Sequence, residues 1–243
     1  LQTSLQYLLE NDVLAAETDG FRVKSTVEGF DALWQRWEQA KPKWADDAYL
    51  AVLLALLDVT LPNLPAILRG EQSPIELLYT DPDVDPINAV YGGHPLADYL
   101  NRQLADALVE AVQAKLAESP QAKLRVFEIG AGGGATSKAV LQRLQPYRQH
   151  LAEYCLSDLA ESALTGPLAQ LLGAEYPFLR THRFDVQKPP AQQSIAMGHY
   201  DFVIASNVLH VARDIRASLA NAKALLRDQG QLLLIEMSAP SLL

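Results

Sequence analysis

Cysteine is nearly absent from this chain of 243 residues. The single one, Cys155, cannot form an internal disulfide, and it lies in an apolar stretch where a thiol packs as a small hydrophobic side chain. The five histidines share no metal-ligand spacing and no Cys or Asp cluster joins them, so we expect no catalytic metal. Sparse cysteine favours a cytoplasmic location.

Long apolar runs and clusters of positive charge are also missing. The longest apolar run, residues 49–57, is too short to cross a bilayer, and the N-terminus lacks the basic-then-apolar order of a signal peptide. The net charge is −9 and no basic run occurs, whereas phosphate binding needs clustered Lys and Arg. We therefore expect a globular protein, 49% apolar, with neither a membrane nor a nucleic acid as its partner.

The first 116 residues have a helical pattern. Apolar side chains recur three and four residues apart in segments 29–40, 46–58 and 96–116, and prolines separate these segments. A small hairpin is expected around Asp19-Gly20. We interpret residues 1–116 as an N-terminal helical subdomain, although the pattern alone equally allows a packing unit without chemistry.

The pattern changes at Lys123. Apolar strands are predicted at 124–129, 153–157, 178–184, 200–206 and 231–237, with helices at 136–144, 161–172 and 213–226. This alternation predicts a parallel sheet with helices on both faces, so residues 117–243 belong to the doubly wound, Rossmann-like α/β class. Ligands of such sheets bind at the carboxyl ends of the strands, where the strand order reverses.

A glycine-rich loop follows the first of these strands. Gly130, Gly132 and Ala135 satisfy the pattern G-x-G-x-x-[GA] between a strand and a helix. The two glycines permit a tight turn and close approach of a ligand to the backbone, and the small third residue lets helix and strand pack closely. The loop predicts a nucleoside cofactor.

Acidic residues at three successive strand ends favour a cationic cofactor over a dinucleotide. Glu128 precedes the glycines, where it can face the ammonium and sulfonium of S-adenosylmethionine. Asp158 can accept the ribose hydroxyls, and Asp185 can bind the adenine amino group. A nicotinamide dehydrogenase is disfavoured by Glu128. The alternative is that these acids are strand-end residues and helix caps. The predicted cofactor site is completed by the residues that follow the strands: Leu159, Val186, Ser206 and Asn207.

A histidine and a carboxylate follow the last two strands. His210 lies after the fourth strand, where imidazole can act as a general base near neutral pH. Glu236 lies at the end of the fifth and can hold one imidazole nitrogen, which fixes the tautomer. A purely structural histidine is the alternative, but the neighbouring glycine loop and carboxylate favour catalysis.

The sequence resembles the methyltransferase domains embedded in modular polyketide synthases, especially carbon-methylating domains of bacterial assembly lines that use a separate acyltransferase. The likeness rests on residues 127–137, 144–154, 200–210 and 214–226, and it reaches upstream to 89–101. The resemblance implies a class I methyltransferase core that binds S-adenosylmethionine. A complete sheet of this class has two more strands after the fifth, so we expect the core to be truncated there.

The resemblance also implies a reaction and its partners. His210 and Glu236 match the family's catalytic pair, while Tyr91, Tyr99 and Asn101 match a segment near cofactor and substrate. The implied substrate is a β-ketoacyl thioester on the phosphopantetheine arm of an acyl carrier protein, methylated at its alpha carbon. Neighbouring polyketide synthase domains are the other implied partners, and the N-terminal helices fit the family's lid.

The sequence leaves two other functions open. The same His-Glu pair could support O-methylation of a hydroxyl, since that reaction also removes one proton. A non-catalytic scaffold domain is the other, and it is suggested by the glycine loop, which has Gly133 and Ala135 where the family usually has Thr and Gly.

Overall fold

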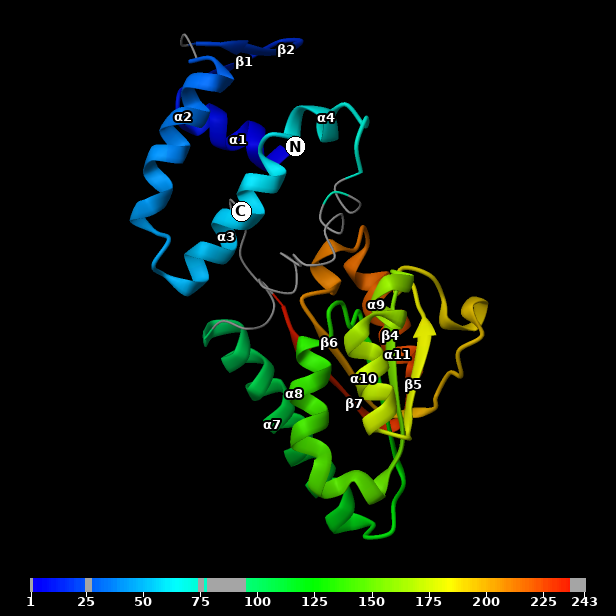
Figure 1. Cartoon of the computed structure of the whole chain (residues 1–243). Helices are drawn as coiled ribbons and strands as arrows, with labels where there is room; N and C mark the ends of the chain where they lie inside the picture. The colour runs from blue at the N-terminus through cyan, green and yellow to red at the C-terminus, as the bar shows by residue number, and fades with distance from the viewer. Residues whose placement is uncertain (1, 25–27, 74–76, 78–94, 237–243) are drawn as a thin grey trace. The chain divides into compact units, whose positions relative to one another are not determined.

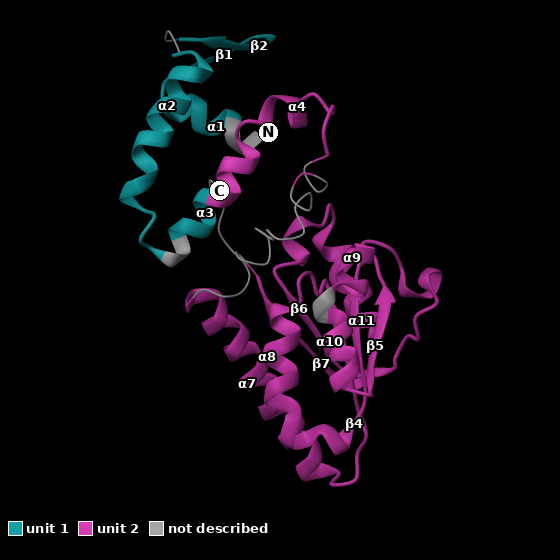
Figure 2. Ribbon diagram, viewed as in Figure 1, with its two compact units in different colours: residues 1–54, 238–243 teal, residues 55–237 magenta. Residues whose placement is uncertain are grey.

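A computed structural model describes residues 2–24, 28–73, 77 and 95–236 (Figure 1). The chain divides into two compact units, with residues 1–54 in one and residues 55–237 in the other (Figure 2). Each unit is described by itself. No helix among the described residues is long and apolar enough to span a membrane.

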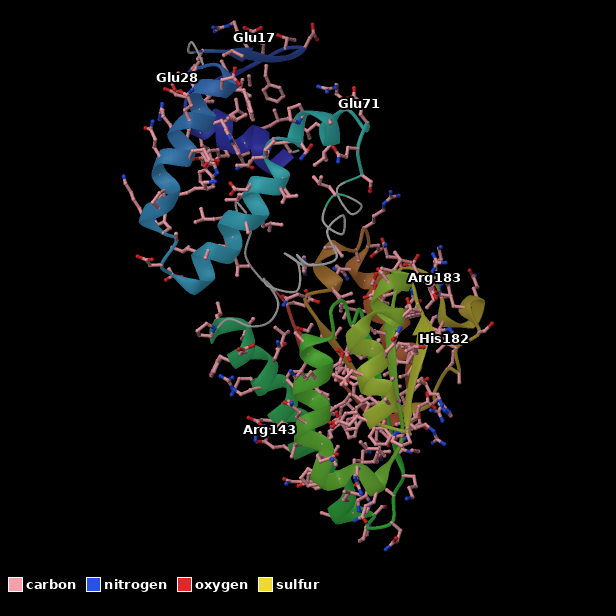
Figure 3. The ribbon with its side chains drawn as sticks, in the orientation of Figure 1. Glu17, Glu28, Glu71, Arg143, His182 and Arg183 are labelled. Atoms are coloured by element: carbon pink, nitrogen blue, oxygen red, sulfur yellow. The ribbon has the colours of Figure 1, made fainter. Side chains whose placement is uncertain are left out.

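The N-terminal unit is helical with one hairpin. Its elements are α1 (Gln2–Glu10), β1 (Leu14–Glu17), β2 (Gly20–Val23), α2 (Phe30–Ala40), the 3-10 turn η1 (Lys41–Lys43) and α3 (Ala48–Thr60), which runs past residue 54. β1 and β2 are antiparallel and turn at Glu17 and Gly20, as the sequence predicts. Its surface carries local ion pairs, including Glu17 with Arg22 at 2.6 Å and Glu28 with Arg36 at 2.7 Å; Figure 3 labels the two glutamates.

The second unit is built on a parallel sheet. Its strands are β3 (Leu124–Ile129), β4 (Leu151–Asp158), β5 (Leu179–Arg183), β6 (Tyr200–Ser206) and β7 (Leu226–Ile235), in the order β5-β4-β3-β6-β7. All neighbouring pairs are parallel. The order reverses between β3 and β6, so the predicted doubly wound class is confirmed and a ligand site is expected beyond the ends of these two strands.

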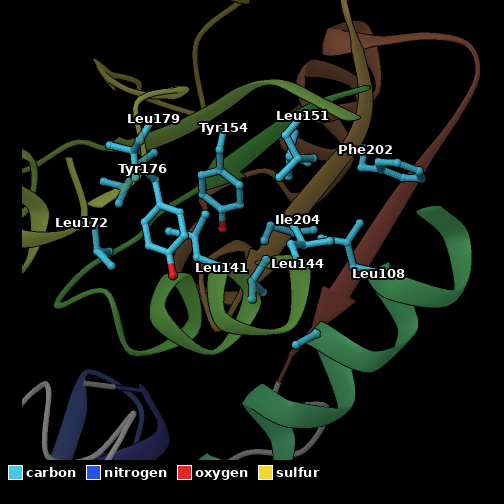
Figure 4. Packing of buried hydrophobic residues seen from close by; sticks show 14 of the residues in the cluster. Leu108, Leu141, Leu144, Leu151, Tyr154, Leu172, Tyr176, Leu179, Phe202 and Ile204 are labelled. Atoms are coloured by element: carbon cyan, nitrogen blue, oxygen red, sulfur yellow. The ribbon is translucent and has the colours of Figure 1, made fainter. Parts of the chain in front are cut away.

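Alternate side chains of the central strands β3, β4 and β6 enter two separate cores. On one face, Val126, Tyr154 and Ile204 pack with the helices α7 (Pro95–Glu118), α8 (Ala135–Leu144), α9 (Glu161–Thr165) and α10 (Pro167–Glu175) (Figure 4). On the other face, Phe127 and Val203 pack with α11 (Ile215–Leu225). The remaining helical turns are α4 (Leu64–Leu68), η2 (Gln145–His150), η3 (Pro190–Gln193) and η4 (Leu209–Val211).

The long helix α7 packs with the sheet. Leu104, Leu108 and Val112 are buried in the core that α8 and β7 also contact, and Arg143 of α8 pairs with Asp106 of α7 at 3.0 Å (Figure 3). The expected boundary at residue 116 assigned α7 to the helical subdomain, whereas the compact units meet at residues 54 and 55. The lid role of the N-terminal helices stays a prediction.

Two element boundaries differ from the sequence-based expectation. The helix predicted over 161–172 is two helices, because Pro167 cannot donate a backbone N–H and Gly166 before it is extended, with φ −66° and ψ 168°. The last strand begins at Leu226, directly after α11, and not at residue 231. Its polar first residues, Arg227 to Gln229, lack the apolar pattern of a buried strand.

Candidate cofactor and catalytic site

The glycine loop joins β3 to α8 through left-handed backbone. Gly130 has φ +68°, Gly132 has φ +52°, and Gly134, the residue that caps α8, has φ +78°. A Cβ at Gly130 would lie 2.3 Å from Val208 Cγ2, so only glycine fits there. A Cβ at Gly132 would meet nothing within 4 Å. The loop is therefore closed against the protein at Gly130 and open at Gly132.

A cavity of about 270 Å³ lies beside this loop at the carboxyl ends of β3, β4, β5 and β6. Eight of the nine residues predicted to bind the cofactor line it: Gly130, Gly132, Asp158, Leu159, Asp185, Val186, Ser206 and Asn207. Sequence reasoning missed further lining residues, namely Thr136, Phe184, Gln187, Val208, Val211 and Ala212. Most of these adjoin predicted residues, so the strand-end rule could have found them.

Asp158 holds the glycine loop from the neighbouring strand. Its Oδ2 accepts the Gly132 N–H at 2.9 Å, and its Oδ1 accepts the Ala160 N–H at 2.8 Å. Each carboxylate oxygen has a second lone pair, which leaves capacity for ligand hydroxyls. Asp158 can therefore cap the loop and bind ligand hydroxyls at the same time.

Asp185 also lines the cavity, two residues after the end of β5. Its Oδ1 accepts the Gln187 N–H at 3.0 Å, and its Oδ2 is 3.3 Å from Lys188 Nζ. The Gln193 side chain brackets the Asp185 backbone, accepting its N–H at 2.7 Å and donating to its carbonyl at 2.9 Å. Gln193 carries no sequence signal, because it reaches Asp185 only through the fold of the η3 turn.

Glu128 lies behind the loop and does not line the cavity. Its side chain is in the apolar core with the residue 1% exposed, and the Tyr154 hydroxyl donates to its Oε2 at 2.6 Å. The pKa of Glu128 is raised to about 7: burial raises it most, hydrogen bonding by Tyr154 and Ser137 lowers it in part, and the charge of Asp158 raises it by a smaller amount. Ser137 lowers the pKa of Glu128 by its proximity. Among the residues that the structure describes, neither the Ser137 hydroxyl nor Glu128 Oε1 has a hydrogen-bond partner of good geometry. The direct ammonium contact expected of Glu128 is not supported.

Replacing this carboxyl should change how stability depends on pH. The native pKa of Glu128 lies above its ordinary value of 4.5, so its contribution is full below about pH 4.5 and is lost as the pH rises through about 7. We expect Glu128→Gln to remove roughly 2 to 3 kcal/mol of the decline in unfolding free energy between about pH 5 and about pH 8. Urea unfolding at both pH values measures this, with the exposed Glu118→Gln as the matched control. Equal pH slopes in Glu128→Gln and the wild type would contradict it.

His210 and Glu236 are in direct contact beside the cavity. His210 Nδ1 is 2.7 Å from Glu236 Oε2, and both side chains are about one-fifth exposed, at 24% and 21%. A carboxylate can only accept, so Nδ1 carries the proton and the lone pair is on Nε2. Nε2 makes no hydrogen bond with the described part of the chain. The sequence-based expectation that these two residues meet agrees with this geometry.

The upstream residues predicted to contact substrate lie on or before α7. Asn101 is buried, and its Oδ1 accepts the hydroxyl of the cavity residue Thr136 at 2.8 Å. Tyr99 is 51% exposed, and neither residue lines the cavity. Tyr91 lies outside the described residues. Asn101 thus supports the start of α8, and the substrate roles stay predictions.

The cavity fits an adenosyl cofactor, whereas the described residues offer no metal site. The open backbone at Gly132 admits a ligand, Asp158 and Asp185 present acceptors, and Leu159 and Val186 add apolar walls. Within the parts of the chain that the structure describes, no group of three or more His, Cys, Asp and Glu side chains could hold a metal ion.

Comparisons with known proteins show which family and which solved structures this chain is similar to. Residues 127–232 match the model of a methyltransferase domain family. The whole chain is 36% identical over 242 residues to polyketide synthase PksM of Bacillus subtilis (strain 168), of which it spans 6%. Among solved structures, the DszA carbon methyltransferase (26% identity, TM-score 0.82) and the CurJ carbon methyltransferase (28%, 0.80) match 98% and 99% of this chain, which covers 60% and 61% of theirs.

The order of the parallel sheet and the match to a methyltransferase family make this chain an S-adenosylmethionine-dependent methyltransferase of the α/β class. With the relatives above, the chain belongs to the methyltransferase domains of polyketide synthases. It spans less than a tenth of the length of PksM.

Proposed function

We propose that this domain methylates the alpha carbon of a β-ketoacyl thioester carried on the phosphopantetheine arm of an acyl carrier protein. The observation that carries the proposal is the 2.7 Å contact between His210 Nδ1 and Glu236, which leaves Nε2 as the accepting nitrogen. Two structurally similar chains are described as carbon methyltransferases, which favours carbon over oxygen as the acceptor.

The reaction needs one proton removed from a carbon between two carbonyl groups. His210 Nε2 takes this proton, and the positive charge that develops on the ring is stabilised by Glu236. A positioned base of this kind contributes roughly 10²- to 10⁴-fold to the rate.

The cofactor side of the reaction depends on the cavity. S-adenosylmethionine, when bound, supplies the methyl group that the substrate carbon takes. Gly132 would let the cofactor approach the backbone, and Asp158 would accept its ribose hydroxyl groups. Asp185, with Leu159 and Val186, would hold its adenine ring. Acyl carrier proteins and adjoining polyketide synthase domains are the partners we propose.

The test is methylation of a carrier-bound β-ketoacyl thioester, read by mass spectrometry with fragmentation. We expect one added methyl group on the alpha carbon. A β-hydroxyacyl thioester on the same carrier is the matched control, and it should react far more slowly because its alpha carbon adjoins only one carbonyl. A methyl group found on oxygen would support O-methylation instead. Cofactor binding without any methylated product would indicate a scaffold domain.

A further inference from the structure

The Glu236 carboxylate is surrounded by hydrogen-bond donors. Its Oε1 accepts the backbone N–H groups of Val208 at 3.0 Å and Leu209 at 2.6 Å. Its Oε2 accepts Nδ1 of His210 at 2.7 Å and, more weakly, the His210 N–H at 3.3 Å. Only one of these four contacts belongs to the imidazole ring, so orientation of the ring does not account for the whole arrangement.

The other contacts hold the turn that leads into η4. This 3-10 helix has three residues, and the N–H groups at its start have no partner within it, so Glu236 satisfies them from the neighbouring strand end. The turn is opened by Asn207, which has φ +54° and donates its N–H to the Ile235 carbonyl at 2.7 Å. The hydrogen bonds to Glu236 and to Ile235 both join the turn to the end of β7.

The same turn forms one wall of the cofactor cavity. Asn207, Val208 and Val211 all line it. The methyl groups of Val208 also fill the space beside Gly130, where an added Cβ would lie only 2.3 Å from Val208 Cγ2. The position of the turn therefore sets both this wall and the fit of the glycine loop against it.

We propose that Glu236 positions two things through different oxygens: Oε2 orients the His210 ring, and Oε1 holds the turn that shapes the cofactor cavity. The first half rests on the proposed function of His210. The second half does not, because it concerns cofactor binding alone. Glu236 is in this sense a positioning residue for the cofactor.

The two oxygens can be separated by substitution. In Glu236→Gln the amide oxygen can replace Oε1 and still accept from Val208 and Leu209. Its NH₂ then faces Nδ1 of His210, which must become an acceptor, and the ring proton moves to Nε2. This variant should keep the cavity and lose the base. Glu236→Ala removes both oxygens and should lose both.

The experiment is calorimetric binding of S-adenosylhomocysteine to the chain together with single-turnover methylation. We expect Glu236→Ala to bind at least about tenfold more weakly, from the loss of charge-assisted bonds to buried N–H groups. Glu236→Gln and His210→Ala should bind within about threefold of the wild type, while Glu236→Gln should turn over as slowly as His210→Ala. Melting curves of each variant set a temperature at which all are folded.

A second variant keeps the proposal testable if Glu236→Ala does not fold. Val208→Ala retains every Glu236 hydrogen bond but removes the methyl groups beside Gly130, and it should weaken binding several-fold. Wild-type affinity in a folded Glu236→Ala, or in Val208→Ala, would overturn the cavity role. An equal loss of affinity in His210→Ala would also overturn it, because the effect would then act through the ring. Full turnover in His210→Ala with weak binding in Glu236→Ala would refute only the role of His210 as the base and leave the cavity role of Glu236 standing.

Discussion

His210→Ala should lose about 10²- to 10⁴-fold in single-turnover rate and keep its affinity for S-adenosylhomocysteine. The ring acts on the substrate proton through Nε2, and it does not line the cofactor cavity, so removing it deletes the base without opening the cofactor site. A rapid-quench assay on a carrier-bound β-ketoacyl thioester measures the rate, and calorimetry measures the affinity.

The matched control for this variant is His150→Ala. His150 ends the η2 turn that leads into β4, at the opposite edge of the sheet from the site. Its removal should leave both the rate and the affinity unchanged. Full activity in His210→Ala would make that histidine a structural residue.

Gly132→Val should reduce cofactor binding by roughly 100-fold or more. The new side chain meets no protein atom at its Cβ, so it points into the space that a ligand needs beside Asp158. The left-handed φ of +52° adds backbone strain, because a β-branched residue rarely adopts it. Calorimetry with S-adenosylhomocysteine measures the loss.

Gly173→Val in α10 is the matched substitution for that experiment. A Cβ there also meets nothing within 4 Å, but the residue lies in a helix away from the cavity. It should bind the ligand as the wild type does. Undiminished affinity in Gly132→Val would remove the glycine loop from the cofactor site.

The strand-end residues could be predicted because their positions follow from chain order. Asp158 ends β4, Asp185 comes shortly after β5 and Asn207 directly follows β6, and parallel strands bring their carboxyl ends to one edge. His210 and Glu236 could be paired for the same reason, since β6 and β7 are neighbours. Local sequence was enough for these residues because the parallel topology brings the ends of the strands together in space.

The features that escaped prediction depend on side-chain direction and tertiary contact. Glu128 has the right place in the sequence for a ligand, yet its side chain turns toward Tyr154 on the core face of β3. Helix α7 has the pattern of the preceding helices, and only its packing on α8 and β7 shows which unit it belongs to. The sequence pattern of a helix does not specify which of the two compact units the helix belongs to.

The packing of α7 has a consequence for where this catalytic unit can be cut. The recognisable family segment is residues 127–232, but the sheet face that it contains is covered by side chains from outside it: Leu104, Ala105, Leu108 and Val112. A fragment limited to that segment would expose this apolar face to water and would lose the Asn101 support of Thr136 as well. It would also end before Glu236, which holds the turn of the cofactor cavity. The packed unit is thus wider than the matched segment on both sides, and a domain border drawn from sequence similarity alone would fall inside it.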